Sequence, residues 1–499
     1  MAKKFTNHNV IIFLALMIIG LTINSLFLGN HYSLDAYFVE KNQDEMMINI
    51  QSSLGRPLIV FFGILFKFLN IKVMEHQVLL MIIAQVFLSL SALLVVTKIL
   101  PDNREKKSAI IILICASLLI TNNIFNIELL SHIYLAVFSS LAVLLNVLAA
   151  RIVSEKQTLT KYLLSCVLVT CSLCLYQGWG ALFLPLVLVF YLLEKNYSII
   201  ILLKRIVIFT SIYLFACIIN LIYLKVIHPH FFGNIEHRAE NNINIISNII
   251  TIIKIQKNIW LYHDYLLPKY FFMISVIVLI LISISIIIKN KLKLTFNLLI
   301  SAFIVMLICI LPFMPHLITA TVWAVPRTIP VISALPGFLI LISLIFIQDS
   351  SKTFNNNMHS ITLLVSVIIF MRIIVSTTQI ESDQIATNKI DEEMATLIVN
   401  TIQVKEKELN TTVTKLSFIQ DKNPKYMYKD IKGFGDLNVR AMVIDWTAKI
   451  LISNISNKAY QITEFDKDIY DDYFKDKNWD FFSPDQIIIK DNVAYIAMF

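Results

Sequence analysis

Three acidic residues after the first apolar run are candidates for catalysis. Asp35 lies among aromatic and apolar residues, between Tyr32 and Tyr37, and Glu40 and Asp44 follow it. An acidic side chain beside hydrocarbon costs about 2.5–3.5 kcal/mol at a helix centre, so its position carries information. The alternative for all of them, and for Asp44 and its neighbour Glu45 above all, is a solvated acidic loop, because runs of charge are usually only solvated. We therefore place Asp35 first among the candidate catalytic carboxylates.

A second set of residues could bind a phosphate group. Arg327 stands between Pro326 and Pro330 near the end of an apolar run, and a planar guanidinium pairs well with phosphate oxygens. His316 ends the preceding apolar run, and Arg238 lies in a polar loop that contains several histidines. The alternative for Arg327 is an anchor whose charge reaches the membrane surface. The histidines lack the spacing of a recognised metal motif, so no metal site is predicted.

Two further motifs interrupt apolar stretches. Arg56 stands between a glycine and a proline, and Tyr176 and Gln177 precede a Gly-Trp-Gly sequence. Glycine on both sides of the tryptophan suits a tight turn between two spans. The alternative interpretation of this aromatic turn is an anchor at the membrane interface.

The order of these motifs resembles a known family. The chain is similar to the O-antigen glucosyltransferases of phages and bacteria that convert serotype, which belong to the multispanning, lipid-sugar-dependent glycosyltransferases of the C-type fold. The similarity extends over about residues 9–377, and it rests on Asp35, Gly55-Arg56, Tyr176-Gln177 and Pro326-Arg327-Thr328.

The chain departs from this family at one point. The family often has paired acidic residues in the first loop, whereas here Ala36 follows Asp35. Glu40 or Asp44 could supply a second carboxylate, or the reaction needs only one.

The resemblance implies a transfer of a sugar, glucose in this family, at the outer face of the membrane. Nucleotide sugars are not available there, so the donor would be a polyprenyl-phosphate sugar. Asp35 would act as general base on the acceptor hydroxyl, and the product anomer would be inverted. Arg327, with Arg238 or His316, would neutralise the departing phosphate. The resemblance also assigns substrate binding to Arg56, Tyr176 and Gln177.

The apolar runs must hold these residues at one face of a bilayer. Each span needs roughly 20 apolar residues, and we predict eleven, at about 9–29, 77–97, 108–123, 130–150, 162–176, 178–193, 206–224, 270–288, 294–313, 329–347 and 359–377. Basic residues of the short loops then fall on one side, which makes that side and the N-terminus cytoplasmic. The loops 30–76 and 225–269 face outward, and Pro57–Ile71 is an interfacial or re-entrant helix.

Composition and charge exclude a soluble globular enzyme. Hydrophobic residues make up 57% of the 499 and charged residues 15%, against about 25% in ordinary soluble domains. The first 379 residues carry a net charge of +13 and residues 380–499 a net −5. The basic excess fits membrane-flanking loops, so no nucleic-acid partner is predicted.

The expected fold is therefore an all-α polytopic membrane protein with a small extracytoplasmic α/β domain. The transmembrane domain is predicted over 1–379 and the accessory domain over 380–499. In the accessory domain we predict a helix over Ser382–Lys407 and strands near Lys415–Ile419, Val439–Ile444 and Gln486–Met498.

The expected partners are a lipid-linked sugar donor, a polysaccharide or glycolipid acceptor and the lipid of a bacterial cytoplasmic membrane. No cofactor is predicted, and a divalent cation stays open. An O-antigen or capsule polymerase is the first alternative. A flippase or transporter of a lipid-linked sugar is the second alternative. Transporters tend to have an internal repeat and charged residues at mid-membrane, and the sequence shows neither feature. A sensor or scaffold with an acidic tail is the third.

Overall fold

The computed structural model describes residues 7–100, 107–155, 158–193, 199–232, 244–289, 294–348, 352–420, 435–477, 479 and 482–498. The chain divides into two compact units. The first unit comprises Met1–Gly29 and Asp44–Gln379, and the second comprises Asn30–Gln43 and Ile380–Phe499. The segment 30–43, predicted as part of the first outer loop, thus belongs to the same unit as the C-terminal residues.

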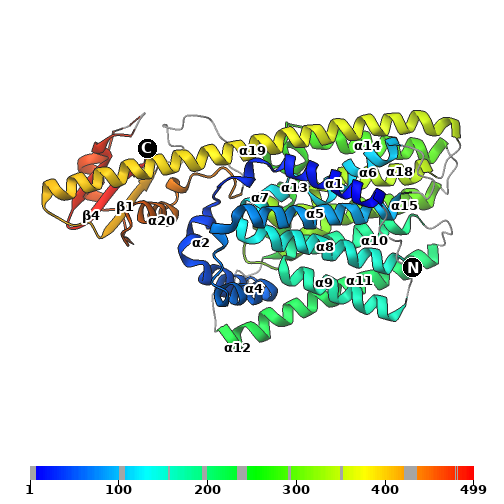
Figure 1. Ribbon diagram of the computed structural model, residues 1–499, viewed down its shortest axis with the longest axis horizontal. Helices are drawn as coiled ribbons and strands as arrows, with labels where there is room; N and C mark the ends of the chain where they lie inside the picture. Colours follow the sequence, from blue (N-terminus) through cyan, green and yellow to red (C-terminus); the bar gives the residue numbers. More distant parts are fainter. Residues whose placement is uncertain are drawn as a thin grey trace. The chain divides into compact units, whose positions relative to one another are not determined.

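The first unit consists of apolar helices (Figure 1). In hydrocarbon every backbone N–H and C=O must be paired within the chain, so sequences rich in isoleucine and valine still form helices there. The long apolar helices are α1 (Asn7–Ile23), α5 (Gln77–Ile99), α6 (Lys107–Thr121), α8 (Ile133–Glu155), α9 (Leu159–Leu175), α10 (Phe183–Tyr191), α11 (Ile199–Ile222), α14 (Phe271–Lys289), α15 (Leu294–Ile310), α18 (Leu335–Gln348) and the first part of α19 (Lys352–Leu409).

Each of the eleven predicted spans overlaps one of these helices. Among the described residues, six helical runs are long and apolar enough to cross a membrane: Val73–Ile99, Ile133–Glu155, Ile200–Phe232, Phe271–Lys289, Phe296–Leu317 and Asn357–Leu409. Other apolar helices, α1, α6, α9 and α18 among them, have between 10 and 17 residues. The protein is therefore a membrane protein, while the number of spans and the cytoplasmic N-terminus stay predictions.

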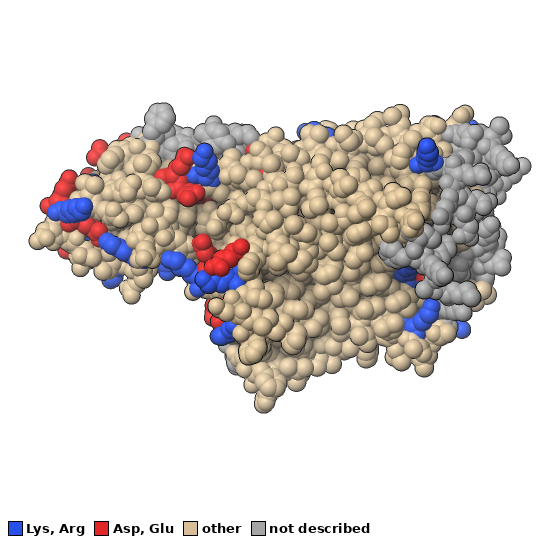
Figure 2. Space-filling view, in the orientation of Figure 1, with Lys and Arg blue, Asp and Glu red and all other residues tan. Residues whose placement is uncertain are grey.

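Burial separates the inner helices of this unit from those that face outward. Helix α18 is buried from Leu335 to Ile347, as expected of a helix that is apolar on all sides. Helices α1, α11 and α14 instead expose large side chains, such as Ile18, Val207 and Leu281. Few charged side chains interrupt the visible face of this helical unit (Figure 2). These exposed apolar surfaces suit contact with lipid.

Short elements connect the apolar helices and carry most of the polar side chains. They are η1 (Leu26–Leu28), η2 (Glu45–Ile50), α3 (Gln51–Ser53), α4 (Pro57–Phe68), η3 (Val73–His76), α7 (Asn126–Ser131), η4 (Gln177–Leu182), η5 (Tyr223–Ile227), α12 (His228–Phe232), α13 (Ile245–Tyr262), η6 (His263–Tyr265), η7 (Leu311–Phe313), α16 (Met314–Leu317), η8 (Pro326–Thr328) and α17 (Pro330–Ser333). Proline begins α4, η8 and α17, where its missing N–H costs no helical hydrogen bond.

The second unit contains a four-stranded sheet in the order β2-β1-β4-β3. Strand β1 pairs in parallel with both β2 and β4. Strand β3 pairs with β4 in antiparallel orientation. The strands are β1 (Lys415–Gln420), β2 (Gln461–Ile462), β3 (Ile487–Lys490) and β4 (Val493–Met498). The remaining elements are α2 (Leu34–Asp44), the end of α19, η9 (Ala441–Val443), α20 (Asp445–Ser456), α21 (Lys467–Ile469), η10 (Tyr470–Phe474) and η11 (Pro484–Gln486).

The core of the second unit joins α2 to the C-terminal elements. Leu34 and Tyr37 of α2 pack with Ile398 of α19, Leu416 of β1 and Ile496 of β4 in one buried cluster. This shared core explains why a segment near the N-terminus belongs to this unit.

Two of the three strand predictions for the second unit are correct, and the third is wrong. Strand β1 lies where Lys415–Ile419 was predicted, and β3 and β4 lie within Gln486–Met498. The segment Val439–Ile444 instead forms the short helical turn η9. The buried Asp391 carboxylate accepts hydrogen bonds from the Arg440 side chain and from the backbone N–H of Ala441, and these contacts hold the backbone in a turn.

Candidate active site

A buried ion pair lies at the centre of a polar network in the first unit. Glu128, on α7, is fully buried, and Arg327, on η8, is 8% exposed. The guanidinium Nη1 of Arg327 lies 2.6 Å from Oε1 of Glu128, and the backbone N–H of Arg327 donates to Oε2 at 2.7 Å. A buried charge is tolerated when it is paired and hydrogen-bonded in this way. The two contacts therefore fix both the backbone and the side chain of Arg327.

Two aromatic rings stack against the arginines of this network. The guanidinium of Arg327 lies over the ring of Trp323, 4.5 Å from its centroid, and that of Arg56 lies over Tyr176 at 4.4 Å. The Tyr176 hydroxyl donates to the backbone carbonyl of Arg327 at 3.0 Å. The Tyr176 side chain thus connects the two arginines, and each arginine gains a cation–π contact.

Amide side chains connect Arg56 to the neighbouring elements. Arg56 donates from Nε to Gln177 at 3.2 Å and from Nη1 to Gln51 at 2.8 Å. The Gln177 amide in turn donates to the carbonyl oxygens of Leu54 and Gly55, at 2.8 and 2.9 Å. Arg56, Tyr176, Gln177 and Arg327, four predicted substrate-binding residues, therefore lie in one network.

Close backbone approach at Gly178 makes this network possible. A Cβ atom at Gly178 would lie 2.9 Å from the carbonyl oxygen of Arg327 and 3.1 Å from that of Thr328. It would also lie 2.9 Å from a ring carbon of Tyr176. Only glycine lets η4 and η8 pack at this distance without a shift of backbone atoms.

A strained loop beside the ion pair carries a second carboxylate. His263, Asp264 and Tyr265 of η6 all have positive φ angles, of 47°, 54° and 64°. Burial and the nearby charge of Glu128 raise the pKa of Asp264 from 3.8 to about 6, and Oδ1 of Asp264 accepts a hydrogen bond from Asn258 at 2.9 Å. A carboxyl group with a pKa in this range, next to charged groups, is typical of functional sites.

Other predicted residues of the first unit lie outside this network or outside the described residues. Asp44 forms a half-exposed ion pair with Lys67 at 2.9 Å. His316 lies on α16 and is partly buried, and its backbone carbonyl accepts from Thr319 at 2.9 Å. Arg238 lies outside the described residues.

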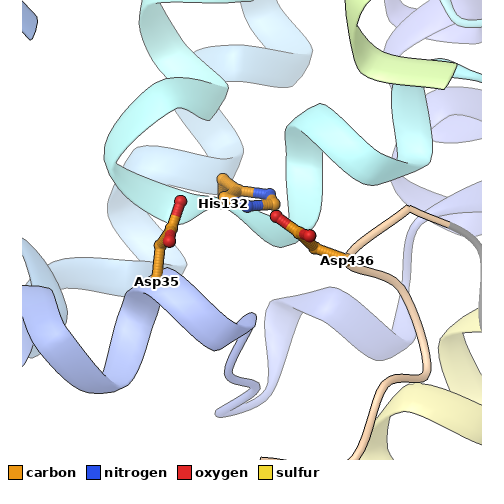
Figure 3. Close-up of side chains that lie close together, drawn as sticks. All are labelled: Asp35, His132 and Asp436. Atoms are coloured by element: carbon orange, nitrogen blue, oxygen red, sulfur yellow. The ribbon is translucent and has the colours of Figure 1, made fainter. Parts of the chain in front are cut away.

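Asp35 and Glu40 project from α2 in the second unit. Glu40 accepts a hydrogen bond from Asn454 at 2.9 Å in an exposed position. Oxygen atoms of Asp35 and Asp436 lie within 4.8 Å of each other, and both side chains are partly buried (Figure 3). Ca²⁺ takes six to eight oxygen ligands, so this pair alone would give an incomplete cation site.

Glu128, Asp264 and Asp436 were not among the sequence-predicted site residues. Glu128 stands in an apolar stretch with no lysine or arginine nearby in sequence, and the cost of such a position could have identified it. Its partner Arg327 is 199 residues away, so no local pattern joins the two. Asp264 and Asp436 carry no such signal, because Asp264 lies in the predicted outer loop 225–269 and Asp436 in the predicted accessory domain, where acidic residues are expected.

Comparison with known proteins gives a family for this chain. A family model described as glucosyl transferase GtrII matches residues 25–344, which is more than half of the 499 residues. The matched range includes Arg56, Glu128, Tyr176, Asp264 and Arg327. Neither the curated proteins nor the solved structures give a match.

Proposed function

The chain belongs to the GtrII glucosyl transferase family, and from this premise we propose that it transfers glucose from a polyprenyl-phosphate carrier to a cell-surface polysaccharide. The family match confirms the family that the order of motifs indicated. Together, the family match and the long apolar helices identify the protein as a membrane glycosyltransferase. The donor, the acceptor and the inversion of the anomeric centre are the proposed parts.

The observation that carries the proposal is the network around Arg56 and Arg327. A phosphate that leaves the anomeric carbon gains negative charge on oxygen, and positioned cations stabilise that charge most effectively in a buried setting. Glu128 holds Nη1 of Arg327, and Tyr176 and Gln177 hold Arg56. Two oriented guanidinium groups within one network support a phosphate-binding role.

We propose Asp35 as the general base, with Glu40 and Asp44 as the next candidates. The base would take the proton of the acceptor hydroxyl while the oxygen attacks the anomeric carbon on the face opposite the phosphate. The bond to the phosphate oxygen breaks as the new glycosidic bond forms, so the product has the inverted configuration. Asp35 has this role because of the family resemblance and its partly buried position on α2.

We propose that the reaction takes place at the outer face of a bacterial cytoplasmic membrane. The basic residues of the short loops support this orientation, because such residues concentrate on the cytoplasmic side. Sugar donors at the outer face arrive on lipid, and the exposed apolar surface of the first unit suits a polyprenyl chain. In this arrangement the second unit, with its net negative charge, is an accessory domain that recognises the polymer acceptor.

Sugar transfer by the purified protein in nanodiscs tests the proposal. The protein is supplied with radiolabelled glucosyl polyprenyl phosphate and surface polysaccharide, or with UDP-glucose in place of the lipid donor. We expect label in the polysaccharide only with the lipid donor, and an inverted linkage by NMR. Transfer from UDP-glucose alone, extension of the polymer without donor, or movement of the lipid donor across a bilayer without transfer would each contradict the proposal. The last two results would indicate a polymerase and a flippase.

A further inference from the structure

The loop between α13 and α14 has an unusual density of left-handed backbone. His263, Asp264 and Tyr265 have positive φ, and so does Tyr270 at 65°. For residues other than glycine such conformations are uncommon, and they cost of order 1–3 kcal/mol each where the surrounding structure enforces them. Backbone strain of this kind is concentrated at active sites and ligand clamps.

His263 anchors the loop to the core of the first unit. Its ring stacks on Phe125 and on Phe272, with centroids 4.4 and 4.2 Å away, and its Nε2 lies 2.9 Å from the Ser333 hydroxyl. Burial lowers the pKa of His263 to about 3, so the ring is neutral. The loop is thus fixed from within, and the next two side chains have defined positions.

Asp264 offers an oriented hydrogen-bond acceptor. Asn258 holds one of its carboxylate oxygens at 2.9 Å. The other carboxylate oxygen has no protein hydrogen-bond partner among the residues that the structure describes. That oxygen can accept from a hydroxyl group of a ligand.

Tyr265 offers a flat aromatic face beside this carboxylate. Its ring stacks on Tyr262, with centroids 5.1 Å apart and planes at 26°, while half of the residue surface stays exposed. A pyranose ring has an apolar face of C–H bonds that packs on aromatic rings, and hydroxyl groups at its edge that donate to carboxylates. The two neighbouring side chains match both parts of such a ring.

We propose that Asp264 and Tyr265 form a subsite for a pyranose ring beside the Glu128–Arg327 pair. The inference rests on the proposed function, which requires two sugars near the phosphate-binding arginines. One is the glucosyl group of the donor, and the other is the acceptor sugar. Both have the same recognition chemistry, and binding measurements with two probes tell them apart.

Tyr265→Leu and Tyr270→Leu form a matched pair of variants. Both tyrosines have left-handed backbone and are exposed, by 50% and 40%, so an effect on membrane anchoring or on backbone strain would be shared. Only Tyr265 adjoins Asp264 and stacks on Tyr262. Asp264→Asn provides a second test, because asparagine tolerates positive φ and retains the size of the side chain.

Saturation-transfer NMR on the full chain in nanodiscs gives the affinity for each probe. The probes are a glucosyl phosphate ester of a short prenol, for the donor, and methyl glucoside, for the acceptor. We expect Tyr265→Leu and Asp264→Asn to raise Kd about tenfold, the loss of a stacking contact or of a hydrogen bond to a charged group. Tyr270→Leu should bind as the wild type does. An effect with the prenol ester alone assigns the donor sugar, and an effect with methyl glucoside assigns the acceptor sugar.

Wild-type affinity for both probes in Tyr265→Leu and Asp264→Asn would overturn the subsite, even if the wild-type protein transfers glucose. Conversely, weakened binding in these variants together with a wild-type protein that transfers no glucose would refute the proposed function and leave the subsite in place. Equal weakening in Tyr265→Leu and Tyr270→Leu would also overturn the subsite, because it would indicate a general role of tyrosines in the loop.

Discussion

At the scale of single residues, Glu128 determines how the Arg327 charge is tolerated in the interior. Glu128→Gln retains the size of the side chain but removes the carboxylate charge that pairs with the buried Arg327 guanidinium, and breaking a buried pair costs about 3–5 kcal/mol. We expect a lower thermal unfolding midpoint and weaker glucose transfer. Glu75→Gln is the matched control, because its ion pair with Lys72 is exposed and such pairs contribute less than about 1 kcal/mol. Equal thermal unfolding midpoints for the two variants would show that the buried Glu128–Arg327 pair contributes no more to stability than an exposed ion pair.

The raised pKa of Asp264 predicts how stability depends on pH. Its pKa is about 6 in the folded protein and 3.8 as a model value, so between these pH values the folded state holds a proton that the unfolded chain has released. Stability should therefore fall as pH rises through this window, by at most about 3 kcal/mol. Burial of the carboxyl group raises the pKa most, the Glu128 charge raises it further, and the Asn258 hydrogen bond lowers it.

Asp264→Asn removes the ionisation and should make the protein more stable than the wild type at about pH 7 but not at about pH 4. Thermal unfolding in detergent at the two pH values measures the difference. A stability difference that is the same at both pH values would mean that Asp264 ionises as an exposed aspartate does. If Asp264→Asn is more stable than the wild type but binds sugar more weakly, Asp264 lowers stability in exchange for binding, as functional residues often do.

At the scale of elements, the close packing of η4 on η8 depends on Gly178. Gly178→Ala would bring a methyl group to 2.9 Å from the Arg327 carbonyl oxygen and force the two elements apart. We expect a loss of about 1–3 kcal/mol in stability, as for other overpacked sites, and at least a tenfold decrease in transfer, because Tyr176 would no longer hold both arginines. Gly29→Ala is the control, since its Cβ would have its nearest neighbour at 3.4 Å. If the two variants transfer glucose equally well, the η4–η8 contact does not position the site.

The helices and strands also differ in how well the sequence predicted them. Apolar runs located the helices, because hydrophobic length is a local property, and the short apolar runs within Gln486–Met498 located β3 and β4. The turn at Val439–Ile444 was missed, since the Asp391 side chain that imposes it is 49 residues from Arg440. Motif order predicted Arg56, Tyr176, Gln177 and Arg327, which lie in one network while their role stays a prediction. Glu128 emerged only from a contact between distant elements.

At the scale of the whole molecule, the orientation in the membrane is the main untested expectation. Cysteines substituted for Glu40 and Asn457 should react with an impermeant reagent in intact cells, and a cysteine at Lys106 should not, because positive loops stay in the cytoplasm. Permeabilised cells serve as the control, since all three positions should then react. Labelling at Lys106 in intact cells would mean that Pro57–Ile71 crosses the membrane and that the proposed outer-face reaction is misplaced.

The affinity of the Arg56→Gln variant for the lipid donor is the decisive measurement for the proposed phosphate-binding role of the arginine network. Arg56 is partly exposed, and it donates hydrogen bonds to the neutral amides of Gln177 and Gln51. Glutamine retains hydrogen bonding but removes the cation that we assign to the phosphate. We predict a Kd for glucosyl polyprenyl phosphate at least tenfold above that of the wild type, because a hydrogen bond to a charged group is worth about 1.5–3 kcal/mol. A folded Arg56→Gln protein that binds the donor with wild-type affinity would contradict the account.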